Sequence, residues 1–583
     1  MDASVRLPLV SPPGAQCGCS DEREVKSDKS VGSGSRSDKH ALPVLPVAAL
    51  LDVQKTLTAV DRFSERHHTG ELAERNKIYR DLIPLERPKP GQQYAFQVDL
   101  DACTGCKACV AACHSLNGLD ESELWRTTGV LHGGLPDVPA QQTVTSSCHH
   151  CLSPACMHGC PTRAYEKDPV TGIVRHLDDQ CFGCRYCTLM CPYDAPKYNH
   201  RLGIVRKCDM CSHRLEDHEA PACVDACPNR AISIEIVDHE TMIRNGDANA
   251  FLPGAPTPEH TLPSTVYRSD KRLPANLLPA DFYSTRPEHS HPPLVVMLTL
   301  TQLAVGAFVL GLSLERITGA PIGAPLAQAC FACLWALLAL GASVFHLGRP
   351  WLFYRAVLGL RTSWLSREAL AFGLFAQLAL LYAALVALSL GPHFVGQSLL
   401  ARSAPTVQEL AAAAGLVGVL CSVMVYTATR RAQWSGTQVS VKFLGTTLAL
   451  GAAALLVVSL WNGPQEYDRG TLALLWLELL ASGFKLAFEA NHLAHARNLQ
   501  LTIHKRVAIV MLDELRSATM LRFLLGAAGG LMIPILLLNH GVSIGTRGIF
   551  ATLMFSMLLA SESLERYLFF RAAPASRMPG NLR

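Results

Sequence analysis

The sequence predicts a protein of two unlike parts: a small α+β domain built around cysteine-rich loops, then an all-α bundle of about eight membrane-spanning helices. Two observations predict this fold class. Sixteen of the 21 cysteines fall between Cys103 and Cys227, in four groups of four. Apolar residues make up 49% of the sequence and charged residues only 17%, and the long apolar runs all follow residue 293. A chain of 583 residues is also long enough for more than one domain.

The cysteine groups have the spacing of iron–sulfur ligands. Groups one and three read CTGCKACVAAC (103–113) and CFGCRYCTLMCP (181–192). Three thiolates at C-x2-C-x2-C spacing wrap one cluster, and a fourth cysteine three residues on ligates a second. Groups two and four widen one gap but keep the ending C-x3-C, followed by proline. Group two reads CHHCLSPACMHGCP (148–161), and group four is CDMC (208–211) with CVDACP (223–228). The pattern predicts a ferredoxin-like domain with four [4Fe-4S] clusters.

Zinc and disulfides are the alternative uses of these thiols. A structural zinc site takes four ligands, usually as two CxxC pairs separated by a loop. Here the thiols come in tight fours, which one zinc ion cannot use. A disulfide framework needs an oxidising compartment and fits such dense CxxC runs poorly.

The remaining polar half divides by composition. Residues 1–45 are expected to be a disordered tail whose Cys17 and Cys19 are incidental thiols, and residues 46–92 an amphipathic helical lead-in. The cluster domain is expected over 93–250, entered by a strand at 93–103 and left by one at 231–240. A proline-rich linker follows at 251–293. The net charge of +4, without a basic stripe, predicts no nucleic-acid partner.

The apolar half predicts a multi-pass membrane domain over 294–571, followed by a tail at 572–583. Eight segments are long and apolar enough to span: 294–314, 324–347, 369–390, 408–428, 443–461, 471–490, 521–540 and 548–569. The connections on the side of the termini carry fifteen Lys and Arg residues, against four on the other side. The positive-inside rule therefore predicts a bacterial inner-membrane protein with its cluster domain in the cytoplasm. The absence of a recognisable secretory signal in MDASVRLPLVSPPG agrees with this expectation.

The sequence resembles a known family along most of its length. The residues that carry the resemblance are the cysteine groups, FHLGRPWLFYRAVLGLRTSWLSREAL (345–370), SVMVYTATRRAQW (422–434) and SESLERYLFFRAAPASRMPG (561–580). Together they resemble the four-cluster electron-transfer subunit and the membrane anchor of the dimethyl sulfoxide reductase family of molybdoenzymes, fused into one polypeptide. The resemblance implies that the protein oxidises quinol from the membrane pool and relays electrons to a separate molybdopterin catalytic subunit.

The resemblance also implies how the cysteines pair, because in this family groups one and four exchange their last ligands, as do groups two and three. The implied cluster sets are Cys103, Cys106, Cys109 and Cys227; Cys208, Cys211, Cys223 and Cys113; Cys148, Cys151, Cys156 and Cys191; and Cys181, Cys184, Cys187 and Cys160.

Ionisable groups at the predicted cytoplasmic ends of the spans mark a candidate quinol pocket, since such groups are costly in a membrane. We expect His346 to be the catalytic proton acceptor, because the pKa of histidine suits proton transfer near neutral pH. The pocket candidates are His346, Arg349, Glu489, His492 and Glu562. The alternatives are a headgroup-level histidine without a special role, and a salt-bridge stripe along span six between Lys485 and Glu478 or Glu489.

Haem is a competing cofactor, because it needs axial histidines on facing spans. Its candidate ligands are His346, His492, His495 and His540, and the resemblance implies no haem. Three alternative functions remain: electron flow to quinone instead of from quinol, a polysulfide reductase or hydrogenase as partner, and a zinc-bound membrane scaffold. No catalytic motif for terminal chemistry is visible in this sequence, and the terminal substrate stays open.

Overall fold

The computed structural model describes residues 80–135, 137–319, 325–390, 397–462, 467–539, 543–574 and 577–578. All described residues lie in one compact unit, residues 74–583. The predicted tail at 1–45, with Cys17 and Cys19, lies outside the described residues, as does most of the predicted lead-in at 46–92. His540 also lies outside them. What is described of the lead-in is a 3₁₀ turn, η1 (Arg80–Leu82), and the start of the first strand.

Two small sheets and two hairpins make the β part of the cluster domain. Strand β1 (Gln92–Asp99) pairs antiparallel with β8 (Ile232–Asp238) and parallel with β9 (Val266–Arg268), so the strands predicted before and after the cysteine groups are neighbours. The second sheet has the order β10-β2-β3. Its strands, and those of the two hairpins, are β10 (Leu278–Pro279), β2 (Thr127–Leu135), β3 (Val138–Ser146), β4 (Tyr165–Lys167), β5 (Val174–His176), β6 (Lys197–Asn199) and β7 (Ile204–Arg206).

Short helices grow directly out of the cysteine groups. They are α4 (Ala108–Leu116), α5 (Ala155–Gly159), α6 (Tyr186–Met190), α7 (Ser212–Glu216) and α8 (Ala222–Asp225), and α9 (His239–Asp247) follows the last of the four groups. Three of them begin directly after a residue in the left-handed region: Lys107 (φ 64°), Arg185 (φ 61°) and Cys211 (φ 50°). That conformation is costly for these side chains. It turns the backbone sharply, so that the cysteines of the loop and of the new helix face one space.

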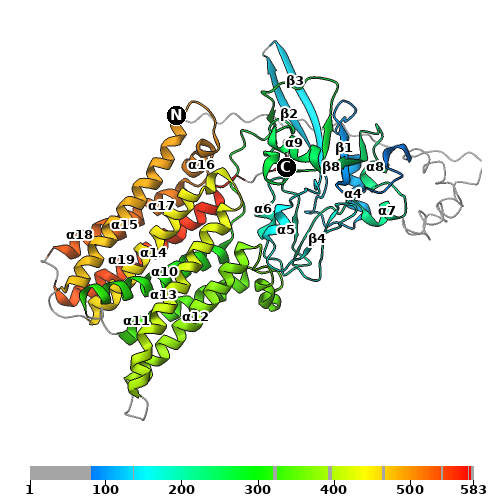
Figure 1. The fold of residues 1–583 in the computed structure, drawn as a ribbon. Coiled ribbons are helices and arrows are strands. Elements are labelled where there is room, and N and C mark those ends of the chain that lie inside the picture. The colour runs from blue at the N-terminus through cyan, green and yellow to red at the C-terminus, as the bar shows by residue number, and fades with distance from the viewer. Residues whose placement is uncertain are drawn as a thin grey trace, which may run out of the picture. The chain divides into compact units, whose positions relative to one another are not determined.

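The second half is a bundle of long apolar helices that run side by side (Figure 1). Its helices are α10 (Pro292–Thr318), α11 (Pro325–Phe345), α12 (Trp364–Ser389), α13 (Gln397–Thr427), α14 (Gly436–Asn462), α15 (Arg469–Leu493), α16 (Ile503–Leu512), α17 (Arg516–Ala527), α18 (Ile533–Leu538) and α19 (Ile544–Arg571). Among the described residues, eight helical segments are long and apolar enough to cross a membrane, which confirms the predicted fold class. Segment seven joins α17 and α18 through a π-helical turn, η6 (Ala528–Met532), and Pro534 follows this turn.

Helix α10 lies at the centre of the bundle, and 78% of its apolar 18-residue stretch is buried. It packs closely on α14 because both helices place a glycine at the crossing, and a side chain on Gly306 would overlap the backbone of Thr447. Many large apolar side chains of the outer helices are exposed, among them Leu374, Leu420 and Phe484. Exposed apolar side chains on the outside of such a bundle suit contact with lipid.

One end of the bundle contacts the loops of the cluster domain. Tyr186 on α6 donates a hydrogen bond from its hydroxyl to the carbonyl oxygen of Val425 (2.7 Å). Ser363 donates from its hydroxyl to the carbonyl oxygen of Gly159 (2.7 Å), just before α12 begins. The amide of Arg349 donates to the carbonyl oxygen of Phe182 (3.0 Å). The bundle therefore holds the loops of cysteine groups two and three by direct hydrogen bonds.

Candidate functional site

The structure brings the sixteen cysteines together in four sets, which we name quartets A to D. The thiol of Cys103 interacts electrostatically with those of Cys106, Cys109 and Cys227, and each of the other sets shows the same kind of mutual interaction. The quartets are A (Cys103, Cys106, Cys109, Cys227), B (Cys208, Cys211, Cys223, Cys113), C (Cys148, Cys151, Cys156, Cys191) and D (Cys181, Cys184, Cys187, Cys160). The assignment of these cysteines to four clusters, with the exchange of last ligands, stays a prediction.

The thiol surroundings suit iron–sulfur clusters. Backbone amides donate hydrogen bonds to the sulfurs of Cys160 (from Ala164, 3.2 Å) and Cys227 (from Ala231, 3.3 Å), which stabilises negative charge on a ligating thiolate. All sixteen thiols are free of disulfides. Four cysteines around one space, with amide donors at the sulfurs, fit the ligand set of a [4Fe-4S] cluster.

The quartets follow one another in a linear order. Quartets A and B meet where Cys109 interacts with Cys223, and quartets B and C meet where Cys148 interacts with Cys208. Between C and D lies the buried side chain of Tyr165, which interacts with thiols of both quartets. The order A–B–C–D therefore runs through the domain, and D is the quartet whose loop contacts the membrane bundle.

An apolar cavity of about 370 Å³ lies against quartet D. Cys184 and Tyr186 of the group-three loop form one wall, and residues of α10, α11, α12 and α13 form the others. The 3₁₀ segment η3 (Pro350–Val357) contributes Phe353 and Tyr354. The side chains that line the cavity are mostly aliphatic or aromatic, and a cavity of this size and character suits the ring of a membrane quinol. A ligand there would lie beside a cluster ligand.

His346 lies at this cavity and is buried. Burial lowers the pKa of His346 to about 4, and the neighbouring His291 and Arg185 contribute to the lowering, so the ring is neutral at pH 7. Its Nε2 atom has no hydrogen-bond partner among the described residues. This pKa is lower than the near-neutral value expected from the sequence, so the imidazole is a weaker base than predicted. As a neutral ring whose Nε2 has no partner in the part of the chain that the structure describes, it can still accept a hydrogen bond from a bound hydroxyl.

Glu368 is a second protonatable group at the cavity, and sequence reasoning missed it. It lies in the first turns of α12, is almost fully buried, and accepts a hydrogen bond from the hydroxyl of Ser422 on α13. Its sequence signal was available: a lone carboxylate at the edge of a long apolar run is an expensive choice. The predicted span begins one residue later, at 369, and therefore leaves Glu368 outside it.

Backbone geometry explains the glycine of the HLGRP motif. A side chain on Gly348 would overlap the carbonyl oxygen of Gly203 and lie 2.6 Å from the hydroxyl oxygen of Tyr198. Gly183, in the group-three loop, has φ +78° and also approaches the Gly348 backbone. Close contact between the loop of quartet D and the segment that carries His346 therefore requires both glycines.

The other predicted pocket residues lie in two further places. Arg349 donates from its guanidinium to the carbonyl oxygens of Asp178 (2.9 Å) and Cys181 (3.5 Å), so it holds the quartet D loop and is not among the residues lining the cavity. Glu489 and His492 line a separate small cavity of about 40 Å³. Glu562 belongs to a buried ionic network. The structure thus brings His346 together with Glu368, and does not bring it together with Glu489, His492 or Glu562.

The buried ionic network joins helices α14, α15, α17 and α19. It contains the cations Lys442, Lys485, Arg522 and Arg566 and the carboxylates Glu489, Glu562 and Glu565. The alternative of a salt-bridge stripe along span six is wrong, because Lys485 pairs with Glu562 and Glu565 on α19. Glu489 pairs with Arg522 on α17 at 3.0 Å. The ion pairs therefore connect different helices and help to fix their packing.

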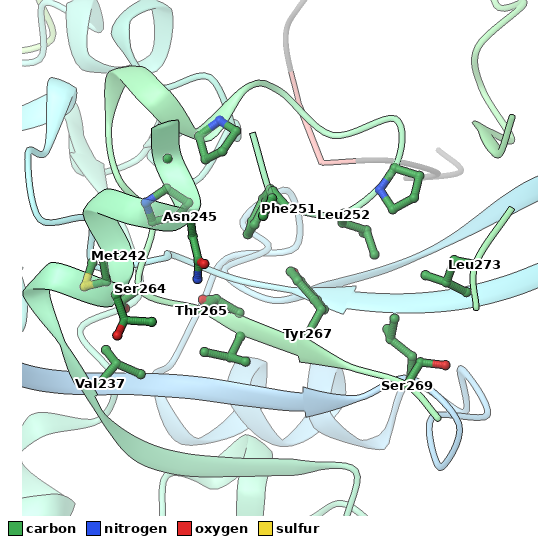
Figure 2. A pocket seen from close by; sticks show the side chains of 18 of the residues that line it. Val237, Met242, Asn245, Phe251, Leu252, Ser264, Thr265, Tyr267, Ser269 and Leu273 are labelled. Atoms are coloured by element: carbon green, nitrogen blue, oxygen red, sulfur yellow. The ribbon is translucent and has the colours of Figure 1, made fainter. Parts of the chain in front are cut away.

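A second cavity of about 370 Å³ lies in the cluster domain (Figure 2). Its walls come from helix α9 (Met242, Asn245), the loop that follows it (Phe251, Leu252) and strand β9 (Tyr267). No cysteine lines it among the described residues. The rings of Phe251 and Tyr267 pack edge-to-face (5.6 Å), so its aromatic wall belongs to the core of the domain, and we assign no electron-transfer role to this cavity.

Fold and site together define a membrane-anchored iron–sulfur electron-transfer protein. Comparison with known families matches residues 140–237 to the 4Fe-4S dicluster domain and residues 288–571 to the DMSO reductase anchor subunit (DmsC). The B subunit of the anaerobic dimethyl sulfoxide reductase of Haemophilus influenzae is 36% identical over 189 residues, which are 31% of this sequence and 91% of that protein. The corresponding B subunit of Escherichia coli K12 is 37% identical over 186 residues, 30% of this sequence and 88% of the relative.

The protein therefore belongs to the dimethyl sulfoxide reductase family, and it joins that family's iron–sulfur subunit and membrane anchor in one polypeptide. It is an integral membrane protein and the electron-transfer part of an oxidoreductase complex. A further relative is the hydrogenase-2 operon protein HybA of Escherichia coli O157:H7, 33% identical over 171 residues, 25% of this sequence and 52% of that protein.

Proposed function

We propose that the protein oxidises quinol in the cavity beside quartet D and passes the electrons through four [4Fe-4S] clusters, in the order D–C–B–A, to a separate molybdopterin catalytic subunit. The observation that carries this proposal is the shared wall: Cys184, a ligand candidate of quartet D, lines the same apolar cavity as His346 and Glu368. A quinol bound there would lie next to its electron acceptor.

The cavity also offers acceptors for the two protons that quinol oxidation releases. His346 is neutral at pH 7 and has an unpaired ring nitrogen, so it can accept the proton of one quinol hydroxyl. We assign the second proton to Glu368, whose carboxylate lies at the cavity in the first turns of α12. The two electrons leave one at a time, because each [4Fe-4S] cluster takes up one electron.

The connection between α11 and α12 is rich in arginine, and its contacts support our proposal that the cluster domain lies in the cytoplasm. Arg355 donates from its guanidinium to the carbonyl oxygen of Asp179 (2.7 Å), and Arg349 does the same to Asp178. Both arginines lie in a connection that the positive-inside rule assigns to the cytoplasm of a bacterial inner membrane. The loop of quartet D therefore contacts the positively charged side of the bundle, and we propose that the molybdopterin partner docks in the same compartment.

Iron analysis and spectroscopy test the relay. On the anaerobically purified protein, we expect about sixteen iron atoms with matching acid-labile sulfide, the number that four [4Fe-4S] clusters contain. After reduction with dithionite, low-temperature EPR should show interacting [4Fe-4S] signals. Little iron and stoichiometric zinc would overturn the proposal and leave the membrane-scaffold alternative.

Quinol reduction tests the cavity. We expect His346→Gln and Glu368→Gln each to slow reduction of the clusters by quinol by about 10²-fold, the lower end of the effect of losing a positioned proton acceptor. Reduction by dithionite should not change, because it bypasses the cavity. His495→Gln is the matched control, since His495 lies on η5 (Ala494–Arg497) and does not line the cavity. Unchanged quinol kinetics in both cavity variants would show that quinol binds elsewhere.

A hydrogenase-type partner is the second candidate, favoured by the similarity to HybA over the cluster domain. In that case electrons would run from the partner to quinone through the same quartets in reverse. Both directions can be measured on the purified protein. Its clusters are first reduced and then mixed with quinone; in a second experiment the oxidised protein is mixed with quinol. A faster rate toward quinone would favour this candidate.

A further inference from the structure

In the part of the chain that the structure describes, two buried cations of the cluster domain have no carboxylate partner. Arg126 is 2% exposed and Lys207 is 3% exposed. Among the described residues, no carboxylate lies within ion-pair distance of either side chain. Arg126 donates to the hydroxyls of Thr145 (3.4 Å) and Ser147 (3.0 Å), which are neutral. A buried cation paired only with neutral oxygens is costly, so negative charge from another group is needed to stabilise it.

The groups that face Arg126 are thiols of two quartets. Its guanidinium interacts electrostatically with Cys109 of quartet A and with Cys113, Cys208 and Cys223 of quartet B. The ring of Phe96 lies 4.6 Å from the guanidinium and helps to fix its position. Arg126 therefore lies between quartets A and B.

Lys207 occupies the corresponding position one step further along the relay. Its ammonium donates to the carbonyl oxygens of Cys208 (2.9 Å) and Val174. It interacts electrostatically with Cys148 and Cys156 of quartet C and with Cys208 of quartet B. Quartet B is thus flanked by both cations, and quartets A and C by one each.

Quartet D differs from the other three. The side chain between C and D is Tyr165, which is neutral at pH 7 and interacts with Cys156, Cys160 and Cys187. Two arginines near D are only half-buried: Arg349, which donates to the carbonyl oxygen of Cys181 (3.5 Å), and Arg185, which follows Cys184 in sequence. The buried Arg431 of the bundle donates to the carbonyl oxygens of Thr188 and Leu189 in the group-three loop, and the thiol with which it interacts electrostatically is Cys191 of quartet C.

We infer that Arg126 and Lys207 are positioning charges that raise the reduction potentials of the clusters on either side of them. A cluster held by four thiolates is negative, and taking up one electron adds one more negative charge. A fixed cation buried at short range in a low-dielectric interior stabilises the reduced cluster more than the oxidised one. The inference rests on the proposed four-cluster relay. It assigns quartet B the largest contribution, and quartet D none, from these two charges.

The test is a potentiometric titration of the full-length protein in detergent, followed by EPR, on wild type and on variants whose iron content equals that of wild type. Arg126→Gln is expected to lower the reduction potentials of the clusters in A and B, and Lys207→Gln those in B and C. Each shift should be at least a tenfold change in the reduction equilibrium, which is 59 mV for one electron. The cluster in D should not move. Lys107→Gln is the matched control: Lys107 is next to Cys106 in sequence but exposed, so water and salt screen its charge.

The outcomes separate this inference from the proposed function. Low iron in wild type would refute the four-cluster relay itself. Full iron with unmoved potentials in both Gln variants would overturn the inference and leave the relay in place. If the Gln variants lose iron, Arg126→Lys and Lys207→Arg decide, since both keep the charge. Potentials close to wild type in these variants support charge as the determinant, and shifted potentials would show that packing sets them.

Discussion

The ion pair between Lys485 and Glu562 gives the sharpest prediction about the membrane half. Lys485 is 1% exposed and Glu562 is 2% exposed. Lys485 also donates to the hydroxyl of Thr446 (2.6 Å) and lies 3.7 Å from Glu565. The change Lys485→Met keeps most of the length and the apolar stem of the side chain and removes the charge. It leaves two carboxylates of α19 without this cation.

The expected cost follows from what remains around these carboxylates. Removing one partner of a buried ion pair costs about 3–5 kcal/mol. Arg522 still lies 3.0 Å from Glu562, which places the cost near the lower end, about 3 kcal/mol. For a domain of this size, that free energy corresponds to a Tm lower by about 8 °C. Thermal unfolding of the detergent-solubilised protein, followed by circular dichroism, measures this shift.

A double-mutant cycle makes the test decisive. In the variant Lys485→Met with Glu562→Gln, both charges are gone, and Arg522 keeps its bond to Glu489. We expect this double variant to regain about 2 kcal/mol relative to the sum of the two single changes. Lys505→Met is the control: Lys505 lies outside the eight spans, and the change should cost less than about 1 kcal/mol. Additive costs in the cycle would refute the reasoning that this pair stabilises the bundle.

Three further predictions concern the join between cluster domain and bundle. Gly348→Ala should slow cluster reduction by quinol with little effect on iron content, since the added methyl group overlaps the backbone of Gly203; Gly341→Ala, where nothing lies within 4 Å, is the control, and equal rates in the two would contradict the packing argument. Glu368→Asp should keep part of the quinol activity that Glu368→Gln loses, because it keeps the carboxylate. Equal kcat values for the Asp and Gln variants would show that the carboxylate is not used in quinol oxidation. Burial lowers the pKa of His291 to about 4, with Arg185 and His289 adding to the effect. As pH falls, His291 is therefore protonated in the unfolded state before it is protonated in the folded state. The free energy of unfolding should decrease as pH drops from about 6.5 to 4. At pH 5 the decrease should be about 1 kcal/mol after allowing for solvent screening. His291→Gln should flatten that part of the profile in chemical denaturation; an unchanged profile would mean that another group titrates there.

The features predicted well are those that depend on neighbours in sequence. A C-x2-C-x2-C loop places three thiols around one space whatever surrounds it, so the four cysteine groups could be identified from spacing alone. Membrane spans follow from the mean hydropathy of about twenty consecutive residues, so eight were found, with ends that differ from the helices by a few residues. The strands at both ends of the cysteine stretch were also predicted, because apolar alternation is a local signal.

The misplaced candidates depended on neighbours in space. Glu489, His492 and Glu562 lie at the same predicted cytoplasmic end of the bundle as His346. The sequence alone cannot show that in the fold they contact other residues and do not line the cavity of His346. The partner of Lys485 was sought along its own helix, where residues three and four apart meet, yet a facing helix supplies it. Arg126 gave no sequence signal, since nothing local distinguishes a buried arginine from an exposed one.

By itself, the sequence determined the chemistry of this protein: sixteen thiols in fours, eight apolar spans and one histidine at the end of a span, next to an arginine-rich connection. Only the tertiary structure decided where these parts meet. It placed Cys184, His346 and Glu368 around one cavity, and it set Arg126 and Lys207 between thiol quartets. The physical reason is that ligand spacing and hydropathy act over a few consecutive residues, whereas electron transfer, proton transfer and charge stabilisation depend on distances between segments far apart in sequence.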